Sequence, residues 1–118
     1  MSKKSKRLVR RLSELVECTD QVVELLQRYK EANIKLSKRI ESGEPLMDVL
    51  GNLNARVEHP RELTETLEEF ETARHQVRVA LFALGMEQGA SMSEIGRVLG
   101  ISRQLSSRLG GEAEEAGS

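Results

Sequence analysis

The chain has 118 residues, of which 31% are charged and 38% hydrophobic, a balance typical of a folded domain and not of a disordered chain. It contains only two Phe, one Tyr and no Trp, and Pro occurs only twice. A core with so few aromatic residues must be built from aliphatic side chains, which suits packed helices better than a β-sandwich. The composition therefore predicts an all-α protein.

The formal net charge is −1, but the charges are unevenly distributed along the chain. Residues 58–71 are strongly acidic, whereas residues 95–111 hold three Arg and no acid. The first eleven residues also lack acids and carry six cations, Lys3, Lys4, Lys6, Arg7, Arg10 and Arg11. Basic ends around an acidic middle indicate a protein that meets a polyanion with part of its surface.

Several classes of protein are disfavoured by what the chain lacks. Cys18 is the only cysteine, which excludes an intrachain disulfide and a cysteine-based zinc site. No apolar run approaches the roughly 20 residues of a membrane span. His59 and His75 are isolated, and neither a phosphate loop nor a nucleophile motif occurs. We expect a cytoplasmic, nucleoid-located protein that is not an enzyme and needs no metal, cofactor or membrane.

A long heptad helix is predicted after a basic disordered arm over residues 1–7. Its seam alternates steps of four and three residues, through Leu8, Leu12, Leu15, Thr19, Val22, Leu26, Tyr29, Asn33, Leu36 and Ile40. Val9, Val16 and Val23 lie on one flank, and Cys18, Leu25 and Ala32 on the other. So wide an apolar face suggests more than one packing partner. Ser42-Gly43 ends the helix.

Residues 8–60 are interpreted as a helical association region that forms a homodimer. The residues assigned to the dimer contact are Leu12, Leu15, Val22, Leu26 and Asn33. Asn33 either fixes the register of a helix pair or sits at a wet end of the bundle. Pairing of the helices, parallel or antiparallel, is left open.

The middle of the chain predicts a short helix over Leu46 to Leu53, a loop over residues 54–60, and a second long helix from Pro60 to near Gln88-Gly89. Arg74 lies on the seam of this second helix, where it either pairs with Glu24 or Glu31 or extends its charge into solvent. The two long helices make an antiparallel hairpin or a dimeric bundle.

Residues 90–109 carry a helix–turn–helix pattern. Ser91 and Glu94 have the spacing of a capping box at the start of a helix over about 92–99. Ile95, Val98 and Leu99 are expected to face inward, and Gly96 leaves room for a second helix. Gly100 suits a left-handed turn. Ile101 fills the corner, Ser102 caps the next helix, and Leu105 and Leu109 anchor it.

The stretch from Glu94 to Gln104 resembles the bacterial helix-turn-helix of the homeodomain-like and sigma-70 region 4-like group, whose members share a Glu-Ile-Gly-x-x-Leu-Gly-Ile/Val-Ser-Arg-Gln core. The resemblance covers roughly residues 75–109. Ser106 stands where the family often has Ala, a more polar choice expected to weaken helix packing slightly. The full expectation is an all-α fold: a long N-terminal heptad helix and a helical hairpin or bundle, followed by a C-terminal helix-turn-helix. Residues 61–109 are expected to hold the second long helix together with the helix-turn-helix DNA-binding region.

The resemblance implies that helix 102–109 enters the major groove of double-stranded DNA. Arg103 would then contact a guanine edge or a phosphate, Gln104 an adenine, and Ser107 and Arg108 phosphates. Ser102 and Arg97 complete the predicted interface. The six cations of the N-terminal arm bind phosphates or lie in a minor groove; they are equally compatible with a solubilising tail. Gly110-Gly111 ends the helix, and residues 110–118 are predicted to be an acidic disordered tail.

Two functions are compatible with the sequence. The first is a DNA-binding homodimer acting as a transcriptional regulator or a small nucleoid-associated protein. The alternative is a helical adaptor for another protein, such as a sigma factor or a replication protein, with a helix-turn-helix that does not bind DNA.

Overall fold

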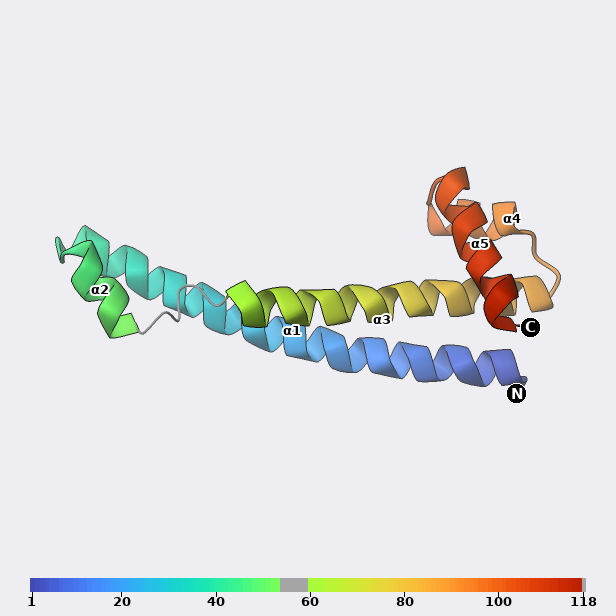
Figure 1. Cartoon of the computed structure of the whole chain (residues 1–118), viewed down its shortest axis with the longest axis horizontal. Coiled ribbons are helices and arrows are strands. Elements are labelled where there is room, and N and C mark those ends of the chain that lie inside the picture. Colours follow the sequence, from blue (N-terminus) through green and yellow to red (C-terminus); the bar gives the residue numbers. More distant parts are fainter. Residues whose placement is uncertain (54–59, 118) are drawn as a thin grey trace. The chain divides into compact units, whose positions relative to one another are not determined.

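The computed structural model describes residues 1–53 and 60–117, which contain five helices and no strand. The helices are α1 (Lys3–Glu41), α2 (Leu46–Leu53), α3 (Pro60–Glu87), α4 (Met92–Leu99) and α5 (Arg103–Gly117) (Figure 1). The predicted all-α class and long N-terminal helix are therefore confirmed. Of the predicted loop 54–60, residues 54–59, including His59, lie outside the described residues.

The chain forms two compact units that each take part of both long helices. The terminal unit comprises residues 1–16 and 71–118, and so joins the first third of α1 to the end of α3, α4 and α5. The central unit comprises residues 17–70 and includes α2. The sequence had suggested a different division, with a boundary between residues 60 and 61.

The start of α1 differs from the prediction, because the supposedly disordered arm is helical from Lys3. Ser2 is the reason: its hydroxyl accepts a hydrogen bond from the Ser5 backbone N–H at 3.1 Å, which caps the helix. The same hydroxyl donates to Glu87 Oε2 at 3.0 Å, so the start of α1 lies beside the end of α3. The start of the helix was predicted from apolar periodicity, which begins only at Leu8 and does not include this polar cap.

The buried face of α1 was half correctly predicted. Every second layer of the predicted seam is at least partly buried, namely Leu8, Leu15, Val22, Tyr29 and Leu36. The alternate layers are not covered within the chain, apart from half-buried Asn33. Leu12, Leu26 and Ile40 are 42–43% exposed, and Thr19 is exposed too. Cys18, Leu25 and Ala32 fill those layers instead, and the last two are only 7% exposed.

A heptad pattern with two apolar flanks allows two seams that share one row of residues. In α1 the shared row is at least partly buried together with the flank that contains small Cys18 and Ala32, whereas most of the other predicted row stays exposed. Asn33 donates its amide to the Tyr29 carbonyl at 2.8 Å, one turn back on its own helix.

The bounds of α2 and α3 agree with the prediction. Val49 of α2 is fully buried. On α3 the predicted seam position Arg74 is exposed, and its neighbour Ala73 is buried. Arg74 extends into solvent, as one of the two predicted alternatives had it, and it pairs there with Glu71 of its own helix at 3.2 Å and not with Glu24 or Glu31.

Three helices end in the same backbone motif. α1, α3 and α4 are each followed by a glycine with positive φ, namely Gly43 (85°), Gly89 (98°) and Gly100 (72°). In each case the next residue donates its N–H to a carbonyl five residues earlier, as in a Schellman motif.

At the end of α1 an ion pair connects the last turn of the helix to the residue after Gly43. Arg39 donates from Nε and Nη2 to the two Glu44 carboxylate oxygens at 2.9 and 2.6 Å. This hydrogen-bonded pairing lowers the pKa of the Glu44 carboxyl and raises that of the Arg39 guanidinium.

Candidate nucleic-acid interface

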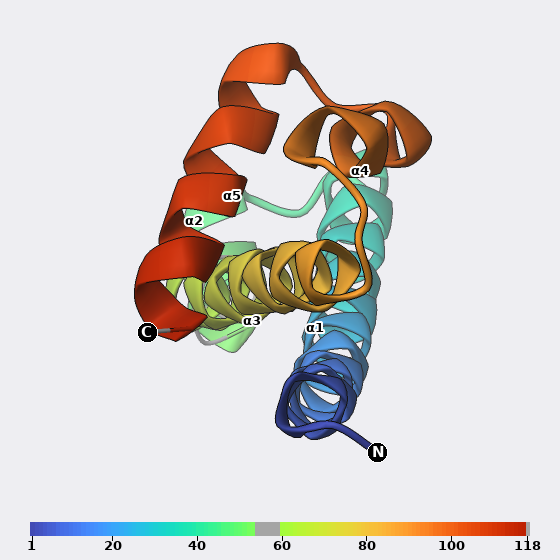
Figure 2. The ribbon, with the colours of Figure 1, turned by 90° about the vertical axis from the view of Figure 1, so that its right-hand side faces the viewer.

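The end of α3 lies beside α4 and α5 in the terminal unit (Figure 2). These three segments share one hydrophobic core. Phe82 of α3 and Leu109 of α5 have no exposed surface, and Ala83 and Ala113 are 2% and 1% exposed. Six partly buried side chains pack against these four: Val79, Met86, Met92, Ile95, Ile101 and Leu105. The predicted corner residue Ile101 and the anchors Leu105 and Leu109 therefore hold α5 in place.

The segment between α3 and α5, which consists of α4 and the turns on both sides of it, has the predicted local geometry. Ser91 Oγ accepts from the Glu94 backbone N–H at 3.1 Å, and the Glu94 carboxylate accepts from the Ser91 N–H at 3.3 Å. The capping box is therefore complete. Gly100 adopts the left-handed conformation that the turn after α4 requires. Ser102 caps α5 by accepting from the Leu105 N–H at 3.1 Å.

Gly96 and Ser106 set the distance of closest approach between α4 and α5. A Cβ atom built on Gly96 would overlap the Ser106 hydroxyl, so only glycine fits this contact. Ser106 is 4% exposed, and its hydroxyl donates to the Ser102 carbonyl at 2.9 Å. The buried hydroxyl of Ser106 thus has a hydrogen-bond partner one turn earlier in the chain.

Two residues of α4 do not face inward as predicted. Val98 is 86% exposed and Leu99 is 42% exposed. α4 has only eight residues, and Met92, Ile95 and Gly96 supply its contacts with the core and with α5. An apolar residue is therefore left in solvent next to the turn.

α5 is almost twice as long as predicted, because it continues through Gly110-Gly111 to Gly117. Tertiary packing overrides the low helix propensity of glycine here. Gly110 is buried against Met92 at a point where a Cβ atom would collide with the thioether, and Ala113 is buried one turn later. The predicted disordered tail is therefore helical over residues 110–117.

The predicted DNA-binding residues of the helix-turn-helix are all exposed. They are Arg97 on α4, Ser102 in the turn, and Arg103, Gln104, Ser107 and Arg108 on the first two turns of α5. With about 100° per residue, the four α5 residues lie on one side of the helix. They form what we call the reading face.

Acidic residues continue the reading face toward the C-terminus. Glu114 and Glu115 are exposed on the same side of α5, one to two turns beyond Arg108. This side of α5 is therefore basic along the reading face and acidic beyond it. Sequence reasoning missed this division because it assigned these glutamates to a disordered tail.

The predicted basic arm is now the first three turns of α1. Arg7, Arg10 and Arg11 line a shallow hollow of about 450 Å³, together with His75 and Gln76 of α3 and with Glu112 and Ala116 of α5. Arg11 pairs with Glu14 at 3.0 Å, and His75 Nε2 lies 2.6 Å from Glu112 Oε2. The first half of α5 does not line this hollow. Lys3, Lys4 and Lys6 lie on the same turns of α1.

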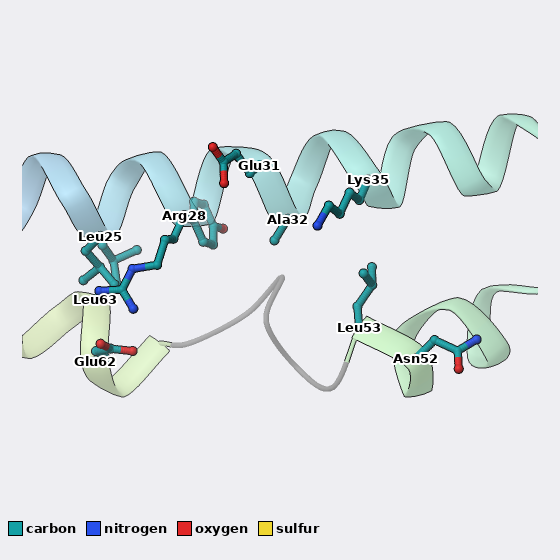
Figure 3. Close-up of a pocket in the computed structure, with 10 residues that line it drawn as sticks. Leu25, Arg28, Glu31, Ala32, Lys35, Asn52, Leu53, Glu62 and Leu63 are labelled. Atoms are coloured by element: carbon teal, nitrogen blue, oxygen red, sulfur yellow. The ribbon is translucent and has the colours of Figure 1, made fainter.

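The central unit holds a larger pocket of about 770 Å³ between α1, the end of α2 and the start of α3 (Figure 3). Its charged lining residues are of both signs: Arg28, Glu31 and Lys35 on α1, and Glu62 on α3. Such a lining favours neither an anion nor a cation. Among the described residues no group of three His, Cys, Asp or Glu side chains is placed to hold a metal ion.

Comparison of the chain with protein-family models, with curated proteins and with solved structures gave no match. Within the described ranges, none of the helices is both long and apolar enough to cross a membrane.

Proposed function

We propose that this protein binds double-stranded DNA, with the first half of α5 in the major groove. The observation that carries the proposal is the reading face: Arg103, Gln104, Ser107 and Arg108 are all exposed on the first two turns of α5. The opposite side of the same turns is fixed to the core by Leu105 and Leu109. A rigid helix whose N-terminal turns carry base-reading side chains is the arrangement that helix-turn-helix proteins use.

Each residue of the face has a chemical role in this proposal. The Arg103 guanidinium offers a planar fork to the O6 and N7 acceptors of guanine or to a phosphate, and the Gln104 amide matches the adenine edge. Ser107 and Arg108 hold phosphates, as does Arg97 of α4. Exposed Val98 is suited to an apolar contact with a thymine methyl group.

The charge distribution favours a sequence-reading regulator over a protein that coats the nucleoid. Binding without sequence preference comes almost entirely from phosphate contacts. The formal net charge here is −1, and Glu114 and Glu115 lie just beyond the reading face on the same side of α5. Phosphate contacts therefore give measurable binding of any duplex only at low salt, and base contacts by more than one copy are needed for stable binding at the salt concentration of the cytoplasm.

The experiment is a fluorescence-anisotropy titration of a labelled mixed-sequence duplex at several salt concentrations. The wild-type protein is compared with Arg103→Ala and with Arg61→Ala, an equally exposed arginine of the central unit. We expect Arg103→Ala to weaken binding about tenfold, because one well-formed arginine contact accounts for roughly that factor. Arg61→Ala should bind as the wild type does.

Equal losses in the two variants would refute the reading face. Binding that does not weaken with salt would refute phosphate contacts altogether. No binding at low salt would refute the proposal for mixed-sequence DNA and would favour the adaptor function, in which the helix-turn-helix is a protein-docking surface.

A further inference from the structure

The hollow between α1, α3 and α5 in the terminal unit carries more basic than acidic side chains. Its described lining includes Arg7, Arg10 and Arg11 of α1, against one acid, Glu112 of α5. The lining residues all belong to the terminal unit. We call this hollow of about 450 Å³ the basic hollow.

The three arginines of the basic hollow lie on one face of α1, three and four residues apart. Arg7 and Arg11 form an i, i+4 pair of like charges, which destabilises a helix. Glu14 compensates Arg11 at 3.0 Å, but among the described residues neither Arg7 nor Arg10 forms an ion pair. Such a conflict with local stability is expected at functional sites.

Glu112, the acid in the wall of the basic hollow, is engaged by α3. Its Oε2 lies 2.6 Å from Nε2 of His75. A carboxylate only accepts hydrogen bonds, so the imidazole donates in this contact. Because Glu112 is held by His75, the positive charge of Arg7 and Arg10 remains for an anion from outside the chain.

The other lining residues fit a ligand that is larger than a bare ion. Val79, Ala80 and Ala116 supply an apolar part of the lining, and the Gln76 amide adds a donor and an acceptor. A volume of about 450 Å³ lies within the range of roughly 300–1,000 Å³ that is typical of small-molecule sites. Guanidinium groups bind phosphate oxygens in a bidentate manner, which favours a phosphate as the charged part of the ligand.

We infer that the basic hollow binds a small phosphomonoester, with its phosphate between Arg7 and Arg10 and its organic part against Val79 and Ala80. A phosphomonoester carries close to two negative charges at neutral pH, which match the two arginines that lack an ion pair within the described residues. A phosphate of the DNA backbone carries only one charge. The site therefore favours a free ester over a nucleic-acid strand.

The acids of α5 also argue against duplex DNA as the occupant. The reading face ends at Arg108, and Glu112 in the wall of the hollow lies about one turn further along the helix, with exposed Glu114 and Glu115 beyond it. A duplex that extended from the reading face to the hollow would lie against these carboxylates, whereas a small ligand approaches the hollow alone. The basic hollow is therefore a site separate from the proposed DNA interface.

An NMR titration of the full ¹⁵N-labelled chain with phenyl phosphate, without DNA, tests the site. We expect saturable amide shifts around Gln76 and Ala116, and about tenfold weaker binding in Arg7→Ala and in Arg10→Ala, because each loses a charge-assisted contact. Lys6→Ala is the matched control, since it removes an equal charge from the same part of α1 outside the lining. Circular dichroism shows whether the variants keep their helices. Absence of saturable shifts, equal losses in Arg10→Ala and Lys6→Ala, or equal binding of phenol would overturn the inference.

The DNA titration described above, repeated with these variants, separates the basic hollow from the proposed function. Arg10→Ala should bind the labelled duplex as Lys6→Ala does, whereas Arg103→Ala weakens that binding about tenfold. A loss of DNA affinity in Arg10→Ala as large as that in Arg103→Ala would place the hollow in the DNA interface and overturn its assignment to a small ligand. Because the phenyl phosphate titration contains no DNA, its result does not depend on whether the reading face binds a duplex.

Discussion

The terminal and central units differ in how their helices are held. In the terminal unit, three short segments enclose Phe82 and Leu109, and each turn has its own cap or glycine. In the central unit, long stretches of α1 and α3 are helical through continuous periodicity, and Val49 of α2 has no exposed surface. Capped turns therefore determine which helix faces pack together, whereas the buried face of an uninterrupted helix depends on the helix that packs against it.

The largest expected effect concerns the core of the terminal unit. Phe82→Ala removes a side chain with no exposed surface and should lower the free energy of unfolding by about 3–5 kcal/mol. Val98→Ala, at a position that is 86% exposed, should change it by less than about 0.5 kcal/mol. Urea denaturation at one protein concentration measures both, and similar losses would contradict the assigned core.

The contact between α4 and α5 can be tested with two glycines. Gly96→Ala should cost about 1–3 kcal/mol, because the added methyl group overlaps the Ser106 hydroxyl. Gly111→Ala is the matched control. No atom lies within 4 Å of its added Cβ, so the variant should gain about 0.5–1 kcal/mol in helix propensity.

Ser106→Gly in the Gly96→Ala background should recover part of the loss, since it removes both Ser106 atoms nearest to the added methyl group. A double-mutant cycle measures this coupling. Strict additivity would show that the two residues do not determine the approach of the helices.

The capping box is expected to contribute less. Ser91→Ala removes the acceptor for the Glu94 N–H and should destabilise the terminal unit by about 1 kcal/mol. Ser13→Ala, on an exposed and uninterrupted part of α1, is the comparison and should have almost no effect. Thermal unfolding of the two variants would rank them, and the reverse order would contradict the importance of the cap.

The smallest effect belongs to the bridge between Arg39 and Glu44. The pKa of Glu44 in the folded state lies below its ordinary value of 4.5. The stabilisation is therefore fully present above that pH and is lost as the pH falls through the lowered pKa. Glu44→Gln should be slightly less stable than the wild type at neutral pH and equal to it in acid. A difference that persists in acid would show that the charge is not responsible.

The sequence contained enough information for the position of most helices. Ser91, Glu94 and Gly100 act within a few residues of each other, so their geometry follows from local chemistry, and the bounds of α4 were correct. The end of α5 was missed because the contact of Gly110 with Met92 is tertiary and leaves no local signal. The Ser2 cap is also a local feature of the sequence, but apolar spacing does not indicate it because this spacing begins only at Leu8.

The sequence predicted that the four reading-face residues are exposed on one side of α5, but it did not predict the acids that continue this side. Arg103, Gln104, Ser107 and Arg108 follow from the helix period once the turn is placed. Glu114 and Glu115 join them only because buried Ala113 keeps the second half of α5 helical. The packing of Ala113 on the buried side of α5 thus keeps the two glutamates on the exposed side.

On the proposed function, the fixed second half of α5 opposes DNA association. Leu109, Gly110 and Ala113 hold this half of the helix against the core, so the backbone of Glu114 and Glu115 stays in place when the basic turns approach a polyanion. The repulsion between these acids and phosphates would rise as the ionic strength falls, in the same conditions that strengthen every phosphate contact. A mismatched duplex would then dissociate quickly, and stable binding would require base-edge contacts that offset the repulsion.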